Sequence, residues 1–366
     1  MRFLLSLVVL VWVMAGCGHA PALIGVENPK VMVESVAGAG HVRVMITTTR
    51  GQSADTAQLY SDRRARTLGL AAVTVSIPPG HVPGALEAPK RLPPDPRREF
   101  AVTDPVVFER DGDFIAEVNA ELARRAPKDR NVLLFVHGFN TTTSDAVLRV
   151  AQFTQDSGFT GVPVLFTWAS AGKVTRYVYD LNSALVARQM LEEASGLLVQ
   201  TKALGFDVFA HSMGTFLVTE TMVQSALRGN LGSSGRLSNI MLAAPDIDID
   251  LFRTQMEQIG PSGGNIFVLL SHDDVALKVS RRLAGGVSRV GAADDKVLAD
   301  MGVTVIDLSA VHLKGTDSHR KYAASPGVVQ VIGEALRRNH YQSAPTAPAV
   351  VDLLQGMPVL GPILGG

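Results

Sequence analysis

The sequence has a single cysteine in 366 residues, which excludes any disulfide within the chain. Lysine plus arginine and aspartate plus glutamate each number 34, so the formal net charge is zero. This balance gives no electrostatic reason to expect nucleic acid as a partner. Beyond residue 17, no apolar run is long enough to span a bilayer as a helix. The 46% of apolar residues instead indicates a well-buried globular core, in one large or two ordinary domains.

The one cysteine follows an apolar N-terminus. After a basic start, residues 3–14 are almost unbroken apolar, and two small residues precede Cys17. This is the layout of a secretory signal. It resembles the bacterial lipobox, in which the cysteine is lipidated and becomes the new N-terminus, although Met14 stands where leucine is usual. We therefore predict a signal peptide over residues 1–16 and a protein anchored in the bacterial cell envelope through Cys17.

The envelope prediction places the protein on the periplasmic or outer-membrane face if the source is Gram-negative. Two alternatives stay open. One is an ordinary signal peptide cut near a cysteine that carries no lipid. The other is a cytoplasmic enzyme whose apolar start is fortuitous. The oligomeric state is not predicted.

The rest of the chain divides by composition. Residues 17–40 are predicted to be the lipidated N-terminus and a tether, since they are small, polar and Gly/Pro-containing. Residues 41–340 form the folded domain, and the Pro/Gly-rich apolar residues 341–366 form a tail that either covers the domain or stays disordered.

Within the folded domain, strand and helix patterns alternate. The run at residues 132–136 is continuously apolar, as in a parallel strand that is buried on both faces. Such alternation predicts an α/β fold, a doubly wound and mostly parallel sheet with helices on both faces. The predicted strands cover residues 42–48, 70–77, 132–136, 163–168, 206–210, 240–244, 266–270 and 303–308.

The pentad Ala210-His211-Ser212-Met213-Gly214 lies between a predicted strand and a predicted helix over 215–227. A serine perched on such a sharp turn is the arrangement of a nucleophile elbow, with small residues where side chains would collide. The sequence therefore predicts Ser212 as a catalytic nucleophile. The alternative is a structural serine in a tight turn.

A serine nucleophile needs donors for the oxyanion of its intermediate. Backbone N–H groups serve this purpose, and the amide of Met213 at the start of the elbow helix is one. The loop after residues 132–136 brings a second, because His137-Gly138 lets the backbone come close and Phe139 offers its N–H. His137 itself precedes the serine, which is the wrong chain order for the base of this triad, so we interpret it as a structural residue.

The serine also needs a base and an orienting acid. In this fold the acid follows a late strand and the histidine follows the last one, which favours Asp274 and His319. Asp273 is an alternative acid one residue away, and His312 is an alternative base. Asp246 is a further acid, although the acidic set that it begins reads more readily as a helix N-terminus.

No other chemistry is indicated. The nine histidines are scattered and the glycine stretches lack a phosphate-loop ending, so neither a metal nor a cofactor is predicted. Substrate specificity is expected in the loop over residues 169–181, where Tyr177 and Tyr179 line a pocket or simply pack.

Segments along most of residues 43–337 resemble a bacterial family of α/β-hydrolases of unknown function. The resemblance implies a serine-hydrolase fold, with the acid at the aspartate directly before x-Ala-Leu, which is Asp274, and the base at His319. Around that histidine the family's Gly-His-Ser-Tyr-like motif is replaced by Asp317-Ser318-His319-Arg320. The segments that carry the resemblance are 73–78 with His81 and Gly84, 135–140, 164–168, 210–214, 243–248, 276–277 with 280–283, and 317–319 with Tyr322.

The leading hypothesis is thus a serine carboxylesterase or lipase-like enzyme of the cell envelope. Its expected partners are an acyl-ester small molecule or lipid as substrate and the membrane through the N-terminal lipid. Peptidase, thioesterase and acyltransferase reactions use the same residues. The alternative from another class is a non-catalytic hydrolase-fold lipoprotein that acts as a scaffold or binding module.

Overall fold

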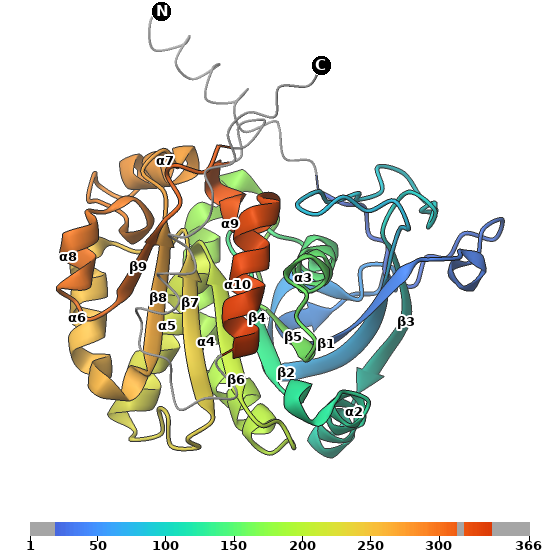
Figure 1. Ribbon diagram of the computed structural model, residues 1–366, viewed down its shortest axis with the longest axis horizontal. Helices are drawn as coiled ribbons and strands as arrows, with labels where there is room; N and C mark the ends of the chain where they lie inside the picture. The colour runs from blue at the N-terminus through green and yellow to red at the C-terminus, as the bar shows by residue number, and fades with distance from the viewer. Residues whose placement is uncertain (1–18, 313–317, 339–366) are drawn as a thin grey trace, which may run out of the picture.

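A computed structural model describes residues 19–312 and 318–338, which form a nine-stranded sheet between two layers of helices (Figure 1). The strand order is β3-β2-β1-β5-β4-β6-β7-β8-β9. All neighbours pair in parallel except β1 with β2 and β2 with β3. The predicted α/β-hydrolase fold is confirmed. The predicted signal peptide, Cys17 and the 341–366 tail lie outside the described residues.

The elements follow the predicted alternation. The strands are β1 (Gly40–Gln52), β2 (Tyr60–Ile77), β3 (Ala101–Phe108), β4 (Val132–Val136), β5 (Val162–Thr167), β6 (Phe206–His211), β7 (Leu237–Ala243), β8 (Asn265–Leu270) and β9 (Thr304–Asp307). The α-helices are α2 (Asp111–Ala123), α3 (Thr143–Ser157), α4 (Tyr177–Val199), α5 (Met213–Leu227), α6 (Ile249–Ile259), α7 (Val275–Leu283), α8 (Asp295–Ala299), α9 (Lys321–Ala324) and α10 (Pro326–Arg338). Short 3₁₀ helices are η1 (Val33–Ser35), η2 (Pro127–Asp129), η3 (Val174–Arg176), η4 (Gly260–Gly263), η5 (Val290–Ala292) and η6 (Ser318–Arg320).

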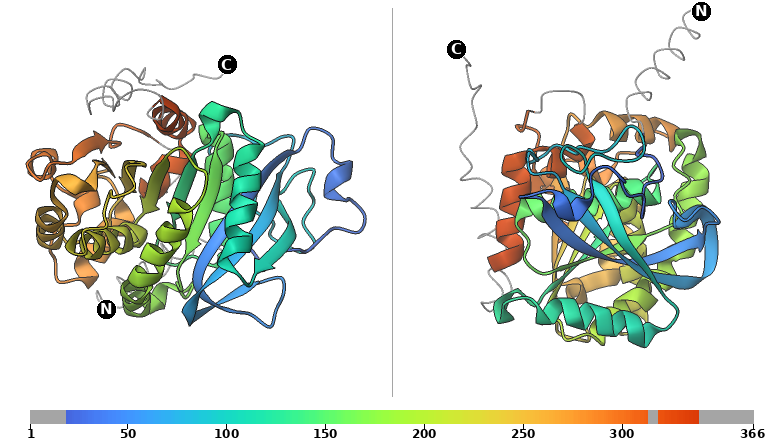
Figure 2. Two further views of the ribbon diagram at one scale, coloured as in Figure 1. Left: turned by 90° about the horizontal axis from the view of Figure 1, so that it is seen from below. Right: turned by 90° about the vertical axis from the view of Figure 1, so that its right-hand side faces the viewer.

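Strand β4 shows how the sequence builds two cores. Val132, Leu134 and Val136 face the core that α2, α4, α5 and α6 cover, whereas Leu133 and Phe135 face the core under α3 and α10. Successive side chains of a strand point to opposite faces, so a continuous apolar run fits a sheet that is covered on both sides. Figure 2 shows these two helical layers. Within the described part of the chain, no helix has the length and apolar character to cross a membrane.

The N-terminal segment differs from its prediction. Residues 19–40 were expected to be a tether, but Leu23 and Ile24 are buried under the antiparallel part of the sheet. The Ile24 and Gly25 N–H groups donate to the carbonyls of Ala57 and Val102. The tether prediction is therefore wrong for the described residues from 19 onward. Because the segment is mostly small and polar, its few apolar residues that pack in the core did not stand out in the sequence.

Strand β3 was also missed, because Pro105 interrupts its pattern. A proline cannot donate to a strand ladder, so within sheets it is tolerated at edges. Strand β3 is the edge strand beside β2, and its register shifts between Ala72 and Thr74 of that neighbour. The edge position explains why the strand forms despite the proline.

Helix α10 packs so closely on α3 that Gly333 leaves no room for a side chain. A Cβ atom there would lie 1.8 Å from the Ser157 carbonyl oxygen. We expect Gly333→Ala to lower the free energy of unfolding by about 3 kcal/mol, because the backbone of α3 must move. Gly196→Ala is the matched control. Gly196 lies inside α4 with nothing within 4 Å of its would-be Cβ, so alanine should stabilise by about 1 kcal/mol in urea unfolding. Equal effects of the two substitutions would contradict this close packing.

Candidate active site

Ser212 stands on a strained turn between β6 and α5. Its φ is 53° and its ψ is −125°, a conformation that costs a non-glycine residue about 1–3 kcal/mol. Several hydrogen bonds hold the turn. The Ser212 N–H donates to the Ala243 carbonyl over 2.9 Å, and the Thr215 N–H and Oγ1 donate to the Ser212 carbonyl over 3.0 and 2.6 Å. The strain is thus sustained by β7 and α5, as a nucleophile elbow requires.

The loop after β4 crosses this turn at two glycines. A Cβ on Gly214 would lie 2.3 Å from the His137 carbonyl oxygen, and a Cβ on Gly138 would lie 2.8 Å from the Ser212 Cβ. Real Cβ atoms essentially never approach other atoms this closely, so both positions need glycine. The close crossing brings the backbone of the loop over residues 137–141 next to the nucleophile.

The two predicted oxyanion donors are available. Met213 is the first residue of α5, and Phe139 lies in the loop after β4. Across residues 19–312 and 318–338, neither amide donates a backbone hydrogen bond. Asn140 follows with a φ of 55°, a left-handed conformation that bends the loop after Phe139. Free N–H groups beside a nucleophile can stabilise the negative charge of a tetrahedral intermediate.

Asp274 and His319 are brought together. His319 Nδ1 lies 2.7 Å from Asp274 Oδ2, and the Asp274 carboxylate is completely buried. Asp274 Oδ1 accepts the Leu277 N–H over 3.0 Å, because Asp274 is the N-cap of α7. One oxygen of the carboxylate is fixed by the helix and the other faces the imidazole. This arrangement can hold His319 in one tautomer and stabilise its protonated form.

The alternative acid, Asp273, points elsewhere. Its carboxylate oxygens lie 2.7 and 3.0 Å from Lys321 Nζ, and Ser271 Oγ also donates to it. Partial burial acts to raise the pKa of Asp273, but the bonds from Lys321 and Ser271 lower it overall. Of the two neighbouring carboxylates, only Asp274 contacts His319 within the described residues. The alternative base, His312, is an exposed loop residue.

His211 supports His319 from the side of the elbow, a role that sequence reasoning missed. Its Nε2 donates to the His319 carbonyl over 3.1 Å, and the two rings lie 4.7 Å apart between centroids. Burial, with the positive potential of His319, lowers the pKa of His211 well below its usual value. A neutral His211 with Nε2 protonated therefore holds the backbone of His319 against the pentad that contains Ser212. The histidine inside the pentad was the only signal.

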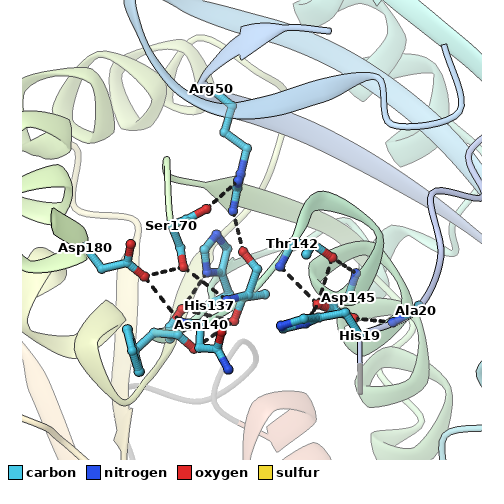
Figure 3. A network of polar contacts seen from close by, with 12 residues as sticks. His19, Ala20, Arg50, His137, Asn140, Thr142, Asp145, Ser170 and Asp180 are labelled. Atoms are coloured by element: carbon cyan, nitrogen blue, oxygen red, sulfur yellow. Dashed lines mark hydrogen bonds and ion pairs between the residues drawn. The ribbon is translucent and has the colours of Figure 1, made fainter. Parts of the chain in front are cut away.

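A buried network holds the loop over residues 137–141 in place (Figure 3). The Arg50 guanidinium donates to Thr167 Oγ1 over 2.8 Å, to the Ser170 carbonyl over 2.9 Å and to the Thr141 carbonyl over 2.7 Å. Asp180, at the start of α4, accepts from Ser170 Oγ and from the Ala171 N–H. Desolvation lowers the pKa of Arg50 to about 10, so the guanidinium stays charged at neutral pH.

His137 belongs to this support. Its Nε2 lies 3.0 Å from Thr167 Oγ1, its ring stacks on Trp168, and the Trp168 indole N–H donates to its carbonyl over 2.8 Å. Burial, reinforced by the charge of Arg50, lowers the pKa of His137 to about 3. A neutral, fully bonded imidazole matches the structural role expected from the sequence.

The first described residues attach to the helix that follows this loop. His19 Nδ1 lies 2.5 Å from Asp145 Oδ2, and the Ala20 N–H donates to Asp145 Oδ1 over 2.9 Å (Figure 3). Asp145 also completes the capping box of α3 with Thr142. The hydrogen bond to Asp145 raises the pKa of His19. The chain therefore starts its described course at the same edge of the sheet as Ser212.

Asp246 forms a second polar cluster at this edge, which we call the Asp246 cluster. Its Oδ2 accepts from the Tyr177 hydroxyl over 3.0 Å, and its Oδ1 accepts from Ser280 Oγ over 2.5 Å and lies 3.3 Å from Arg289 Nε. The helix N-terminus predicted for the acidic set belongs to Asp248, the N-cap of α6. Asp246 contacts no histidine among the described residues.

Of the loop residues expected to set specificity, Tyr177 and Tyr179 behave differently. The Tyr177 ring packs edge-on against Phe139 at 5.3 Å, and its hydroxyl belongs to the Asp246 cluster. Tyr179 donates to the Asp62 carbonyl and lies under the Arg64 guanidinium at 4.3 Å. Only Tyr177 therefore borders the site.

Two further features lie away from Ser212. His272, Asp295 and Asp307 bring one possible metal-ligand atom each within 4.8 Å of one another, and all three are exposed. An apolar cavity of about 160 Å³ lies between α4 and α5, near the amino ends of β6 and β7 at Phe206 and Leu237. Since Ser212 follows the carboxyl end of β6, this cavity is not its substrate pocket.

His81 joins the loop after β2 to α3 through two carboxylates. Its Nδ1 lies 2.7 Å from Glu87 Oε2 and its Nε2 lies 2.7 Å from Asp156 Oδ1. Burial acts to lower the pKa of His81, but the two carboxylates outweigh it and raise the pKa above the ordinary 6.5. The imidazolium thus stabilises the fold fully below pH 6.5, and its contribution is lost as the pH rises through the raised pKa.

This linkage predicts a pH-dependent effect of His81→Gln. The difference in melting temperature between wild type and variant should be largest near pH 6 and shrink as the pH rises, measured by thermal unfolding across that range. The exposed His41 provides the control, since His41→Gln should leave the pH dependence of the melting temperature as it is in the wild type. A constant difference at every pH would show that His81 does not act through its charge.

The match to a protein family agrees with the architecture. Residues 114–335 match the family described as alpha/beta hydrolase of unknown function (DUF900). Similar solved structures include an esterase from Rhizomucor miehei, at 14% identity, a TM-score of 0.36 and coverage of 82% of this chain and 84% of that one. Esterase B from Lactobacillus rhamnosis has 12% identity, a TM-score of 0.40 and coverage of 87% of each chain. A phospholipase from Legionella pneumophila has 16% identity, a TM-score of 0.38 and coverage of 61% of each chain. None of the curated proteins matches the sequence.

Proposed function

The chain belongs to the alpha/beta hydrolases of unknown function, and from this premise we propose that it is a serine hydrolase that cleaves acyl esters. One observation carries the proposal. A serine on a strained elbow shares one sheet edge with two backbone amides that have no acceptor among the described residues and with a histidine whose Nδ1 is held 2.7 Å from a buried carboxylate. Strain, free donors and an oriented base at one sheet edge have a common explanation in covalent catalysis.

In the proposed reaction, Ser212 Oγ attacks the ester carbonyl while His319 Nε2 takes its proton. The N–H groups of Met213 and Phe139 stabilise the oxyanion, and Asp274 stabilises the imidazolium. Collapse of the intermediate expels the alcohol, which receives the proton from His319. A water molecule, deprotonated by His319, then hydrolyses the acyl-enzyme and regenerates Ser212.

A fluorophosphonate probe tests this proposal directly, because it reacts covalently with activated serines. The wild-type chain should be labelled, and Ser212→Ala should abolish the labelling. Ser271 supplies the control, since it lies buried near the site without an elbow and Ser271→Ala should still be labelled. A folded wild-type protein that takes no label would support the non-catalytic scaffold instead.

We also propose that the protein is a lipoprotein of the bacterial envelope, on the basis of residues 3–14 and the small residues before Cys17. Metabolic labelling with palmitate tests this part independently of catalysis. The label should enter the wild-type chain and be absent from Cys17→Ser. Equal incorporation in both would contradict the proposal of a lipid anchor at Cys17, and it would leave the hydrolase proposal intact.

A further inference from the structure

Arg289 is a buried residue whose guanidinium has no hydrogen-bond acceptor among the described residues, and its Nε atom is itself buried. It lies between α7 and η5 and is only 7% exposed. Its Nε lies 3.3 Å from Asp246 Oδ1 as an ion pair, but the geometry does not form a hydrogen bond. In the part of the chain that the structure describes, no acceptor receives a hydrogen bond from any of its three nitrogens.

The two other buried cations among the described residues, Arg50 and Lys321, have hydrogen-bond acceptors. Arg50 donates to one hydroxyl and to the carbonyls of Ser170 and Thr141. Lys321 donates to Asp273, to Ser271 Oγ and to the Leu308 carbonyl. Burying a charged donor without an acceptor is costly, so such a group in a native protein calls for an explanation, and a bound ligand or ion is one. Of these three buried cations among the described residues, Arg289 alone has no hydrogen-bond acceptor.

Arg289 is oriented by the Asp246 cluster. The Asp246 carboxylate already accepts from the Tyr177 and Ser280 hydroxyls, and it faces the Nε edge of the guanidinium. Both terminal nitrogens remain open. This is the fork that binds a carboxylate or a phosphate through two parallel N–H donors.

The cluster adjoins the reacting groups on two sides. The Asp246 N–H donates to the Ser212 carbonyl over 3.4 Å, so the backbone of Asp246 lies next to that of the nucleophile. The Tyr177 ring contacts Phe139, whose amide is a proposed oxyanion donor. An anion held by Arg289 therefore lies within the reach of a substrate whose carbonyl is bound at Ser212.

We propose that Arg289 binds an anionic group of the substrate, and that the preferred substrates are esters carrying a carboxylate or a phosphate. This inference rests on the proposed serine-hydrolase function and names the substrate class of that site. Neutral esters fit the same catalytic residues but offer no acceptor to the two terminal nitrogens of Arg289, which an anionic group would satisfy. The selectivity thus comes from Arg289 rather than from the triad.

Matched ester pairs test the proposal on the full chain. For the carboxylate, mono-para-nitrophenyl succinate is compared with para-nitrophenyl butyrate. For the phosphate, oleoylglycerol phosphate is compared with oleoylglycerol. The wild type should show a kcat/KM at least about 10-fold higher for the anionic member of one pair. Arg289→Met should lower that anionic-to-neutral ratio by about 30- to 100-fold, the loss expected for a bidentate charged contact.

Arg282 provides the matched control, since it is an exposed arginine at the end of α7. Arg282→Met should leave both kcat/KM values within about twofold of the wild type, which separates local binding from general charge. The pair whose ratio falls in Arg289→Met identifies carboxylate or phosphate as the group. A wild type with no anionic preference in either pair, or an Arg289→Met variant that keeps the preference, overturns the inference.

Two measurements keep the test decisive if Arg289→Met fails to fold. Arg289→Lys keeps the charge without the fork and should lower the ratio by about 10-fold. In the wild type, free succinate or inorganic phosphate should inhibit hydrolysis of the neutral ester competitively, and the absence of inhibition by both contradicts the proposal. Failure of the hydrolase function itself is distinguishable, because the neutral esters would then not be cleaved and the fluorophosphonate would not label Ser212.

Discussion

Asp274→Asn is expected to lower kcat for ester hydrolysis by about 10⁴-fold with little change in folding. Asparagine can still cap α7 through Oδ1, which keeps the Leu277 N–H bonded. Its amide NH₂ then faces His319 Nδ1, where the carboxylate oxygen lies at 2.7 Å. The imidazole must accept that N–H, so its proton moves to Nε2 and it can no longer act as a base toward Ser212. Steady-state kinetics on any cleaved ester measures the loss.

Asp273→Asn is the control one residue away. Asp273 binds Lys321, and Lys321 keeps acceptors at Ser271 Oγ and the Leu308 carbonyl after the change. We therefore expect kcat to stay within about threefold of the wild type. A reversed result, with Asp273→Asn inactive and Asp274→Asn active, would assign the triad to the other carboxylate.

Arg50→Met is expected to destabilise the protein by about 3–5 kcal/mol, because the carbonyls of Ser61, Ser170 and Thr141 lose a charged donor. The same change frees the loop over residues 137–141, whose Phe139 amide is a proposed oxyanion donor. A shift of about 1 Å in such a group lowers kcat by roughly 10- to 100-fold. Urea unfolding gives the first quantity, and kcat of the folded variant gives the second.

Arg43 supplies a matched arginine on the same strand. It contacts Thr74, the Asp104 carbonyl and Glu117, but these partners lie away from the elbow. Arg43→Met should lower the free energy of unfolding by about 1 kcal/mol and leave kcat unchanged. If Arg50→Met proves no more disruptive than Arg43→Met, the buried network does not hold the loop.

Local patterns explain why much of the fold was predictable. The apolar run of β4 and the small residues around Ser212 are each dictated by neighbours within a few positions in the chain. A strand buried on both faces must be apolar throughout, and a backbone crossing must be glycine. The resemblance to a hydrolase family then supplied the order of acid and base, which the structure brings into contact as Asp274 and His319.

The features that escaped prediction depend on residues far apart in sequence. Asp274 was predicted as the acid, but the contacts that set it apart from Asp273, the Lys321 bond to Asp273 and the cap of α7 at Asp274, were not. Arg50 contacts the loop over residues 137–141 from a distant strand, and no sequence pattern near Arg50 indicates this contact. Arg289 escaped notice for the same reason.

The attachment of His19 to Asp145 limits the distance between the folded domain and the proposed lipid on Cys17. Cys17 precedes His19 by two Cα steps, which span at most about 7.6 Å. Since Asp145 lies in the first turn of α3, directly after the loop over residues 137–141, a bilayer that holds the acyl chains of Cys17 would lie against the edge of the sheet where Ser212 stands. The enzyme would then meet its substrates by diffusion in two dimensions along the membrane, and releasing the anchor would impair hydrolysis of bilayer lipids far more than hydrolysis of dissolved esters.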